Sequence, residues 1–235
     1  MVNWPYYQQE ITARFGDKQA MAQRIRHMIL AAIAARDLPP GTRLIETELT
    51  QQLSVSRTPL REAMAGLKAD GILAHDDDGI RVRQLDWSAV NNLYEMRATL
   101  EGMAAFQAAK RASIAERNVI DAINQEENRR IDHGAEPDQL AEINSKFHAS
   151  ILAAANNPFL TESFERLSRL LILLGVTAYS LPERVHDIQH EHNAINHALQ
   201  KGDAEGAEQA MKTHLMNGLE ARLHLMANPS TKDLD

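Results

Sequence analysis

Apolar residues in the first third of the chain recur with helical spacing and then give way to two short strand-like runs. Residues 21–35 carry an apolar side chain at about every third or fourth position, which predicts a helix. The Pro-Pro-Gly sequence at residues 39–41 ends it, because proline and glycine interrupt regular structure. A short helix over residues 46–53, a third helix capped by Ser56 and a β-hairpin around residues 76–79 follow. This order is typical of a winged helix-turn-helix.

The rest of the chain shows helical patterns and no strand pattern. Glycine, proline and asparagine interrupt it, so that about six consecutive helices are predicted. Their approximate bounds are residues 86–111, 113–131, 138–155, 159–178, 183–200 and 204–226. The fourth is the most apolar and is expected at the centre. The expected fold class is therefore mainly α, with an N-terminal winged helix-turn-helix and a C-terminal antiparallel all-helical bundle.

These patterns divide the chain into four segments. Residues 1–18 form an N-terminal extension, residues 19–85 the winged helix-turn-helix, residues 86–228 the all-helical domain and residues 229–235 a polar tail. A chain of 235 residues is long enough for two domains.

Composition excludes several classes of protein. The chain has no cysteine, which excludes disulfides, thiolate catalysis and cysteine-bound zinc. Its longest apolar run, residues 170–178, is much shorter than the ~20 residues that a membrane helix needs. The first residues lack the apolar core of a signal peptide. We therefore expect a cytoplasmic protein without a membrane partner.

The formal net charge of −7 is unevenly distributed. Residues 18–85 have a net charge of +2, whereas residues 86–235 have a net charge of −8. The acidic excess thus lies in the segment that DNA need not touch. The distribution permits nucleic-acid binding by the first segment without requiring it.

The third predicted helix begins with hydroxyl and arginine side chains. The second helix of a helix-turn-helix places its N-terminal residues at base edges in the major groove. Arg57 and Arg61 are four residues apart and project from one helix face, where they could read guanine or bind phosphate. Ser56 and Thr58 could add hydroxyl contacts to phosphate. Alternatively, the two arginines pair with nearby acidic residues such as Glu62.

These residues belong to a longer series of motifs, which are Leu38 to Leu44, Glu48-Leu49, Val55 to Ala63, Leu67 and Gly71 to Leu73. The series closely resembles the GntR family of transcriptional regulators over residues 19–83. The resemblance implies a homodimer that binds a palindromic double-stranded DNA operator, with repression as the family expectation. The implied DNA contacts are Arg57, Thr58 and Arg61 on the recognition helix, Thr47 on the preceding helix, and Gly79 at the wing tip.

Two positions depart from the family pattern. Thr47 stands where a basic residue is common, so it cannot supply a charged phosphate contact. The wing tip carries Asp76-Asp77-Asp78, and phosphates would repel these carboxylates unless Arg81 and Arg83 compensate. We therefore expect the recognition helix, rather than the wing, to provide most of the affinity.

Eight of the ten histidines lie after residue 130, and the spacing of three of them suggests a metal site. Asn144 and His148 are four residues apart on one helix and can face one point. His192 and His214 lie on the last two helices, which must pack antiparallel because only a short turn links them. Together these side chains could bind Zn²⁺, Ni²⁺ or a similar ion and leave coordination positions open. Alternatively, each histidine is a surface or core residue without a ligand.

The helical segment also resembles a known domain. The matching residues are Met96-Arg97, Leu100-Glu101, Asn144, Phe147-His148, Asn157-Pro158, Glu191-His192, Ile195, Ala198-Leu199, Gly202-Asp203 and His214-Leu215. They resemble the FCD domain of the FadR subgroup over roughly residues 86–225. The resemblance implies that this domain binds the effector and carries the dimer contacts. The resemblance implies a divalent metal held by Asn144, His148, His192 and His214. Most relatives are expected to have aspartate at position 144. Because asparagine is a neutral ligand, its presence here would weaken metal binding or change the preferred metal.

Arg97 has two possible roles. It lies one turn before Glu101, so the two could form an internal salt bridge. Alternatively, its guanidinium clamps the carboxylate of a ligand, whose geometry it matches. The family resemblance implies that the effector is a small carboxylic acid.

The sequence as a whole predicts a sequence-specific DNA-binding transcriptional regulator, and not an enzyme, whose operator binding responds to a carboxylate effector, a metal or both. One alternative is a metal-dependent hydrolase-like enzyme. It would need a general base beside the metal, and no His-Glu-x-x-His motif is present. The other alternative is a helical scaffold in which a metal is purely structural.

Overall fold

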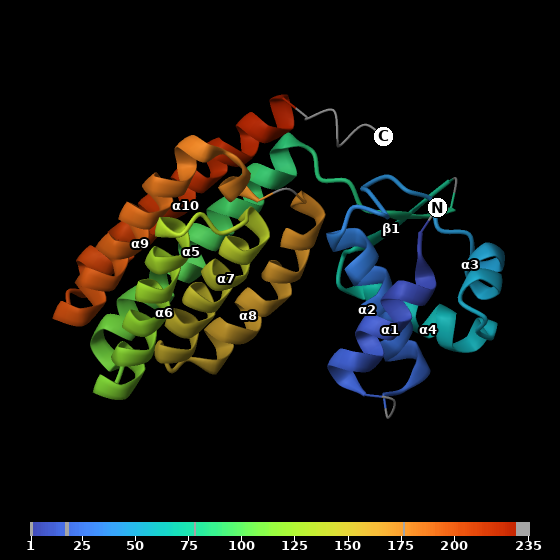
Figure 1. Cartoon of the computed structure of the whole chain (residues 1–235), viewed down its shortest axis with the longest axis horizontal. Helices are drawn as coiled ribbons and strands as arrows, with labels where there is room; N and C mark the ends of the chain where they lie inside the picture. Colours follow the sequence, from blue (N-terminus) through green and yellow to red (C-terminus); the bar gives the residue numbers. More distant parts are fainter. Residues whose placement is uncertain (1, 17–18, 78, 176, 229–235) are drawn as a thin grey trace. The chain divides into compact units, whose positions relative to one another are not determined.

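The computed structural model describes residues 2–16, 19–77, 79–175 and 177–228, and the predicted tail from residue 229 lies outside them. The chain divides into two compact units (Figure 1). The first contains the chain up to Asp86 together with Ser168–Gly175, and the second contains Trp87–Leu167 and the residues from Val176 onward. The first unit therefore includes a segment that is remote from the rest of it in sequence.

The first unit has the predicted order of a winged helix-turn-helix. Its elements are α1 (Trp4–Phe15), α2 (Met21–Ala34), α3 (Glu46–Gln52), α4 (Arg57–Ala69), β1 (Leu73–Asp76) and β2 (Gly79–Val82). The two strands pair antiparallel, with Leu73 opposite Val82. The apolar faces of α2 and α4 pack together, and Ile29 and Leu67 on these faces are fully buried. The predicted three helices and hairpin are thus confirmed.

The N-terminal extension, for which no element was predicted, contains the additional helix α1. Asn3 caps its first turn by accepting a hydrogen bond from a backbone N–H. Trp4, Tyr7 and Ile11 share one face, and all three are buried in the core of the first unit. Trp4 Nε1 also donates a hydrogen bond to Gln52 Oε1 at the end of α3, over 2.8 Å. The extension is therefore part of the folded unit.

The described part of the second unit contains six α-helices, as the sequence predicted. They are α5 (Trp87–Arg111), α6 (Ile114–Asp132), α7 (Pro137–Ala154), α8 (Pro158–Ser168), α9 (Pro182–Lys201) and α10 (Ala204–Ala227). Helix α10 packs along α5 and α9, and α7 packs against α5 and α6 (Figure 1). Phe147, Ile151, Ile195 and Leu199 are completely or almost completely buried in the core of this bundle.

The predicted central helix over residues 159–178 is wrong in length and position. Helix α8 ends at Ser168, and a 3-10 helix, η1 (Arg169–Leu174), follows it. Leu173 is buried in the core of the first unit, and Gly175 ends η1 with a positive φ of 73°. A second 3-10 helix, η2 (Ala178–Ser180), then precedes α9. Apolar residues of η1 thus pack in the core of the first unit. Their hydrophobicity predicted burial but did not indicate which core they would join.

No helix in the described residues is long and apolar enough to cross a membrane.

Candidate metal centre and DNA-binding surface

The start of α4 presents the predicted DNA-reading side chains to solvent. Ser56 occupies the N-cap position with extended backbone angles, but its hydroxyl makes no capping hydrogen bond within the described residues. Arg57 and Thr58 in the first turn are exposed, as is Thr47 on α3. The apolar face of α4, which includes Leu60, is buried behind them. The helix thus offers one polar surface at its N-terminal end.

Arg61 has an acidic partner, although not the one expected. Its Nε lies 2.8 Å from Oε2 of Glu46 on α3, and the arginine side chain is 64% exposed. An ion pair this exposed contributes little to stability. The guanidinium can therefore exchange Glu46 for a DNA phosphate at small cost.

The acidic charge of the wing is partly neutralised. Arg81 Nε lies 3.1 Å from Asp76 Oδ2 within the hairpin. Gly79 has a φ of 117°, and the guanidinium of Arg43 lies beside it. Asp78 lies outside the described residues. The wing therefore combines carboxylates with arginines, and Arg43 is a basic residue there that the sequence analysis did not identify.

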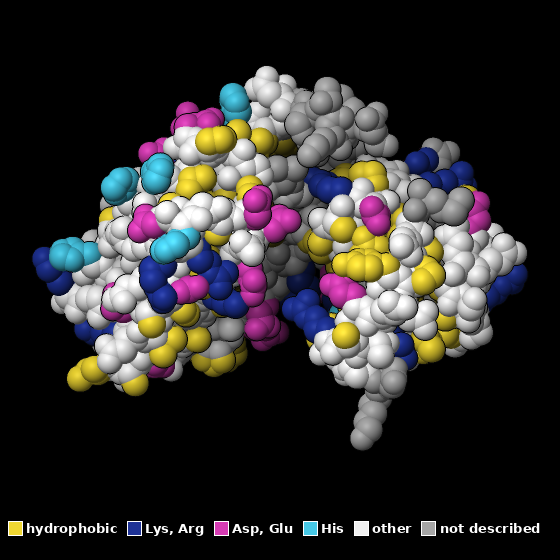
Figure 2. Space-filling model, in the orientation of Figure 1, with side chains coloured by type: hydrophobic (Ala, Val, Ile, Leu, Met, Phe, Trp, Pro, Cys, Tyr) yellow, Lys and Arg dark blue, Asp and Glu magenta, His cyan; other side chains and the backbone are white. Residues whose placement is uncertain are grey.

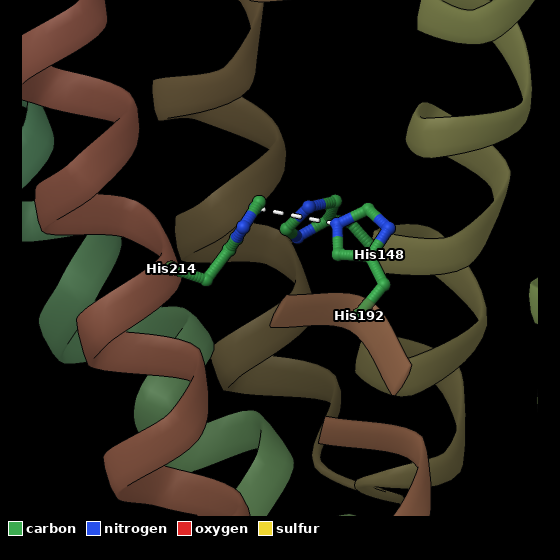
Figure 3. Close-up of side chains that lie close together, drawn as sticks. All are labelled: His148, His192 and His214. Carbon is green, nitrogen blue, oxygen red and sulfur yellow. Dashed lines mark hydrogen bonds between the residues drawn. The ribbon is translucent and has the colours of Figure 1, made fainter. Parts of the chain in front are cut away.

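Three histidines from different helices meet in the interior of the second unit (Figure 3). His148 comes from α7, His192 from α9 and His214 from α10. Each offers a ring nitrogen, and these three nitrogens all lie within 4.8 Å of one another. Nε2 of His192 is 3.3 Å from Nε2 of His214. The structure thus brings together the three histidines singled out by their spacing.

Each of these histidines is bound through Nδ1 to a different glutamate. His148 Nδ1 lies 2.5 Å from Glu101 Oε2, and His192 Nδ1 lies 2.5 Å from Glu127 Oε2. The third pair joins His214 Nδ1 to Glu191 Oε2 over 2.7 Å. A carboxylate acceptor favours the tautomer with the proton on Nδ1, which leaves the lone pair at Nε2.

Each glutamate is held in turn by a further side chain. Arg97 Nε donates to Glu101 over 2.8 Å, and the Tyr179 hydroxyl donates to Glu127 over 2.5 Å. Arg184 binds both carboxylate oxygens of Glu191, over 3.0 and 3.1 Å. The internal salt bridge considered for Arg97 is therefore present. Its pair with Glu101 occupies Nε, and the effector clamp stays a prediction.

Burial and the paired charges set the ionisation of this cluster. Burial and the neighbouring His192 lower the pKa of His214 to about 3, and burial also lowers the pKa of His148. Burial alone would raise the pKa of Glu101, but Arg97 and His148 lower it to about 2. His148 and His214 are therefore neutral imidazoles, and Glu101 is an ionised carboxylate.

The chemistry of this donor set fits a divalent metal. His148 Nε2 is buried and has no hydrogen-bond partner among the described residues. A buried, unpaired acceptor is costly, and a cation shared by the three imidazoles would remove that cost. Backing of metal-bound histidines by carboxylates is also typical of metal sites. Asn144 lies one turn before His148 and is half-buried, and its role as a fourth ligand stays a prediction.

The other histidines of this half do not join the cluster. His133, His186, His190, His197 and His224 are exposed. Figure 2 shows the surface histidines as separate patches on the second unit.

Sequence reasoning missed the supporting residues Glu127, Tyr179, Glu191 and Arg184. For Glu127 a signal existed, because it shares the buried face of α6 with Ile120 and Ile131. An acid on an apolar helix face needs an internal partner. Nothing in the sequence indicated that this partner would be a histidine 65 positions away.

Comparison with known proteins identifies both units. Residues 21–82 match the family model "Bacterial regulatory proteins, gntR family", and residues 92–217 match the "FCD domain". The chain belongs to the GntR family and carries an FCD domain. It is a transcriptional regulator, because the members it resembles are regulators of this kind.

Relatives and solved structures extend this match over most of the chain. A "Probable D-xylose utilization operon transcriptional repressor" of Paenarthrobacter nicotinovorans is 30% identical over 92% of this chain and 94% of its own length. The HTH-type transcriptional regulator YdhC of Bacillus subtilis is 29% identical over 80% of this chain and 84% of its own length. The structure of E. coli McbR/YncC has the same fold, with a TM-score of 0.73, 20% identity, and coverage of 88% of this chain and 99% of that one.

Proposed function

We propose that this GntR-family regulator is a repressor that binds a palindromic operator as a homodimer, and that a divalent metal and a small carboxylate in the helical unit modulate this binding. The convergence of His148, His192 and His214, each with its Nδ1 bound to a carboxylate, carries the proposal. The name of the Paenarthrobacter relative supports repression of an operon for small-molecule use.

The metal would be held by Nε2 of the three histidines, with Asn144 as a further ligand. Zn²⁺ and Ni²⁺ suit imidazole ligands. Such an ion would supply a positive charge with coordination positions left for a carboxylate. Arg97 would orient that carboxylate through its terminal nitrogens while Nε keeps Glu101 in place.

The same contacts argue against a hydrolase. A metal-dependent hydrolase needs a general base free to accept a proton from water. The three glutamates beside the cluster, Glu101, Glu127 and Glu191, each accept hydrogen bonds from a histidine and from a second side chain. None of them is placed as a base. We therefore propose that the site binds an effector and does not catalyse a reaction.

DNA binding is tested by selecting a duplex from a random library with the full-length protein and titrating it by fluorescence anisotropy. Arg57→Ala should weaken binding of the selected duplex about 5- to 150-fold, which corresponds to ~1–3 kcal/mol for an arginine that reads a base. Arg129→Ala is the matched control, because this arginine is also exposed but lies on α6 of the other unit. Equal affinity of the Arg57 variant and the control would contradict the proposed surface.

Effector binding is tested by thermal unfolding in Zn²⁺ with a panel of small carboxylates. At least one carboxylate should raise the melting temperature of the zinc-loaded protein, and Arg97→Lys should reduce that increase because lysine cannot bind a carboxylate bidentately. If zinc removal unfolds the domain and no carboxylate changes the melting temperature, the structural-metal alternative is favoured.

A further inference from the structure

One segment of the chain leaves the helical unit and packs in the DNA-binding unit. We call Ser168–Gly175 the strap. It belongs to the first unit, although α8 before it and η2 after it belong to the second. The strap is therefore attached to the helical unit at both ends by the chain itself, in addition to the connection between Asp86 and Trp87.

Apolar contacts and a hydrogen bond hold the strap in the first unit. Leu173 is 3% exposed in the same core as the α2 side chains, and Leu170 and Ile172 pack against this core. Arg36, just after α2, donates a hydrogen bond from Nη2 to the carbonyl oxygen of Leu174 over 2.8 Å. These contacts fix the strap along the helix that supports α4.

The strap also contacts the C-terminal end of the recognition helix. Asp70 is the C-cap of α4, and its Oδ1 lies 3.0 Å from Arg169 Nε of the strap. The same carboxylate pairs with Arg26 of α2. Leu170 lies against Gly71, directly after the cap. A displacement of the strap would thus act on the helix that carries Arg57.

The other end of the strap leads to the histidine cluster. Four residues after Leu174, the chain reaches η2, whose Tyr179 is 5% exposed. Its hydroxyl donates to Glu127 Oε1, and the other carboxylate oxygen of Glu127 accepts from His192 Nδ1. Of the three side chains that anchor the glutamates, Tyr179 is the one next to the strap in sequence.

We propose that the strap couples the histidine cluster to operator binding, with Tyr179 as the residue that connects them. Occupation of the cluster fixes His192, Glu127 and Tyr179, and this restricts the positions that the strap can adopt on α2 and Asp70. The coupling is a free-energy difference between two docked states of the strap, as any allosteric effect must be. The proposal rests on the proposed function, because it needs both operator binding and ion binding.

The test compares affinity for the selected duplex in saturating Zn²⁺ and in EDTA, with the full-length protein. The wild-type ratio of the two dissociation constants should differ from one by at least about fivefold, the lower end of typical allosteric couplings. Tyr179→Phe, which removes only a hydroxyl, and Arg169→Ala, which removes the ion pair with Asp70, should each bring the ratio within about twofold of one. Arg130→Ala is the matched control, since its side chain is 31% exposed against 36% for Arg169 and pairs with Glu126 on α6.

Amide hydrogen exchange gives a readout that does not depend on DNA. Zn²⁺ should slow exchange in strap peptides of the wild type and of Arg130→Ala, and have little effect on them in Tyr179→Phe. Equal ratios and equal exchange in all proteins would overturn the role of the strap. A wild-type ratio of one, with operator binding intact in the same titration, would overturn the coupling alone. Failure to bind any selected duplex would overturn the proposed function as well.

Discussion

Replacing Glu127 with glutamine tests whether the glutamates prepare the histidines for a metal. Glu127 is completely buried and accepts two short hydrogen bonds, from Tyr179 and from His192 Nδ1. Both partners act as donors, and a carboxylate can accept from both. A glutamine has one oxygen and one NH₂ group, so one donor would face another donor. His192 can relieve this conflict by moving its proton from Nδ1 to Nε2, which removes its metal-binding lone pair.

The magnitude follows from these two bonds. Each hydrogen bond to a charged group contributes ~1.5–3 kcal/mol, and loss of a carboxylate behind a metal-bound histidine lowers metal affinity about 10- to 100-fold. We expect Glu127→Gln to weaken zinc binding within this range. The change in folding stability should be smaller than the lost bonds suggest, because removing a buried charge also removes its desolvation cost. Metal affinity is therefore the more sensitive measurement.

The assay is competition for Zn²⁺ with a chromophoric chelator of known affinity. Glu126→Gln is the matched control, because Glu126 is the adjacent acid on α6 but pairs with Arg129 and Arg130. It should bind zinc like the wild type. Zinc affinities of the Glu127 and Glu126 variants that agree within error would refute the role assigned to the buried glutamate.

Three further changes test other parts of the structure. Asn144→Asp should tighten zinc binding in the same chelator assay, because a charged ligand replaces a neutral one; unchanged affinity would remove Asn144 from the site. Saturating Zn²⁺ at ~100 times its dissociation constant should stabilise the folded protein by ~2.7 kcal/mol, which raises the melting temperature. This increase should be absent in His192→Ala and present in His190→Ala. Trp4→Ala should lower the free energy of unfolding, measured in urea, by ~3–5 kcal/mol because the Trp4 side chain is buried. Tyr6→Ala is the control, because Tyr6 lies on the same helix but is 57% exposed; it should change the free energy of unfolding by less than ~0.5 kcal/mol.

The sequence predicted most helices to within a residue or two because their ends carry strong signals. Ser113 and Glu116 form a capping box at the start of α6, and Gly202 ends α9 in the left-handed conformation. Helix α1 was not predicted, although Trp4 and Ile11 follow helical spacing. A short segment with few apolar residues gives a weak periodic signal, and only the core of the first unit shows what this face contacts.

The strap shows a different limit of prediction from sequence. Residues 170–174 are all apolar, so they indicate burial but no preferred helix face. Hydrophobicity therefore suggested the centre of the bundle, whereas the structure places Leu173 in the core of the other unit. The candidate site was likewise predicted only in part. Spacing identified the histidines, but the contacts of His192 with Glu127 and of Glu127 with Tyr179 join positions more than 50 residues apart.

The charges around the histidines bear on the proposed joint binding of a metal and a carboxylate. Glu101 is balanced by Arg97 and Glu191 by Arg184, whereas Glu127 is held by the neutral Tyr179. By the formal charges of its three glutamates and two arginines, this set carries one excess negative charge, and a divalent cation would change it to one excess positive charge. A buried unpaired charge is costly, so a monocarboxylate ligand would complete the balance. As the proposed further ligand, Asn144 would leave that charge available, whereas an aspartate at this position would neutralise the cation itself. Asn144→Asp should therefore tighten metal binding while it weakens the response to carboxylates, and equal gains for both would contradict this charge balance.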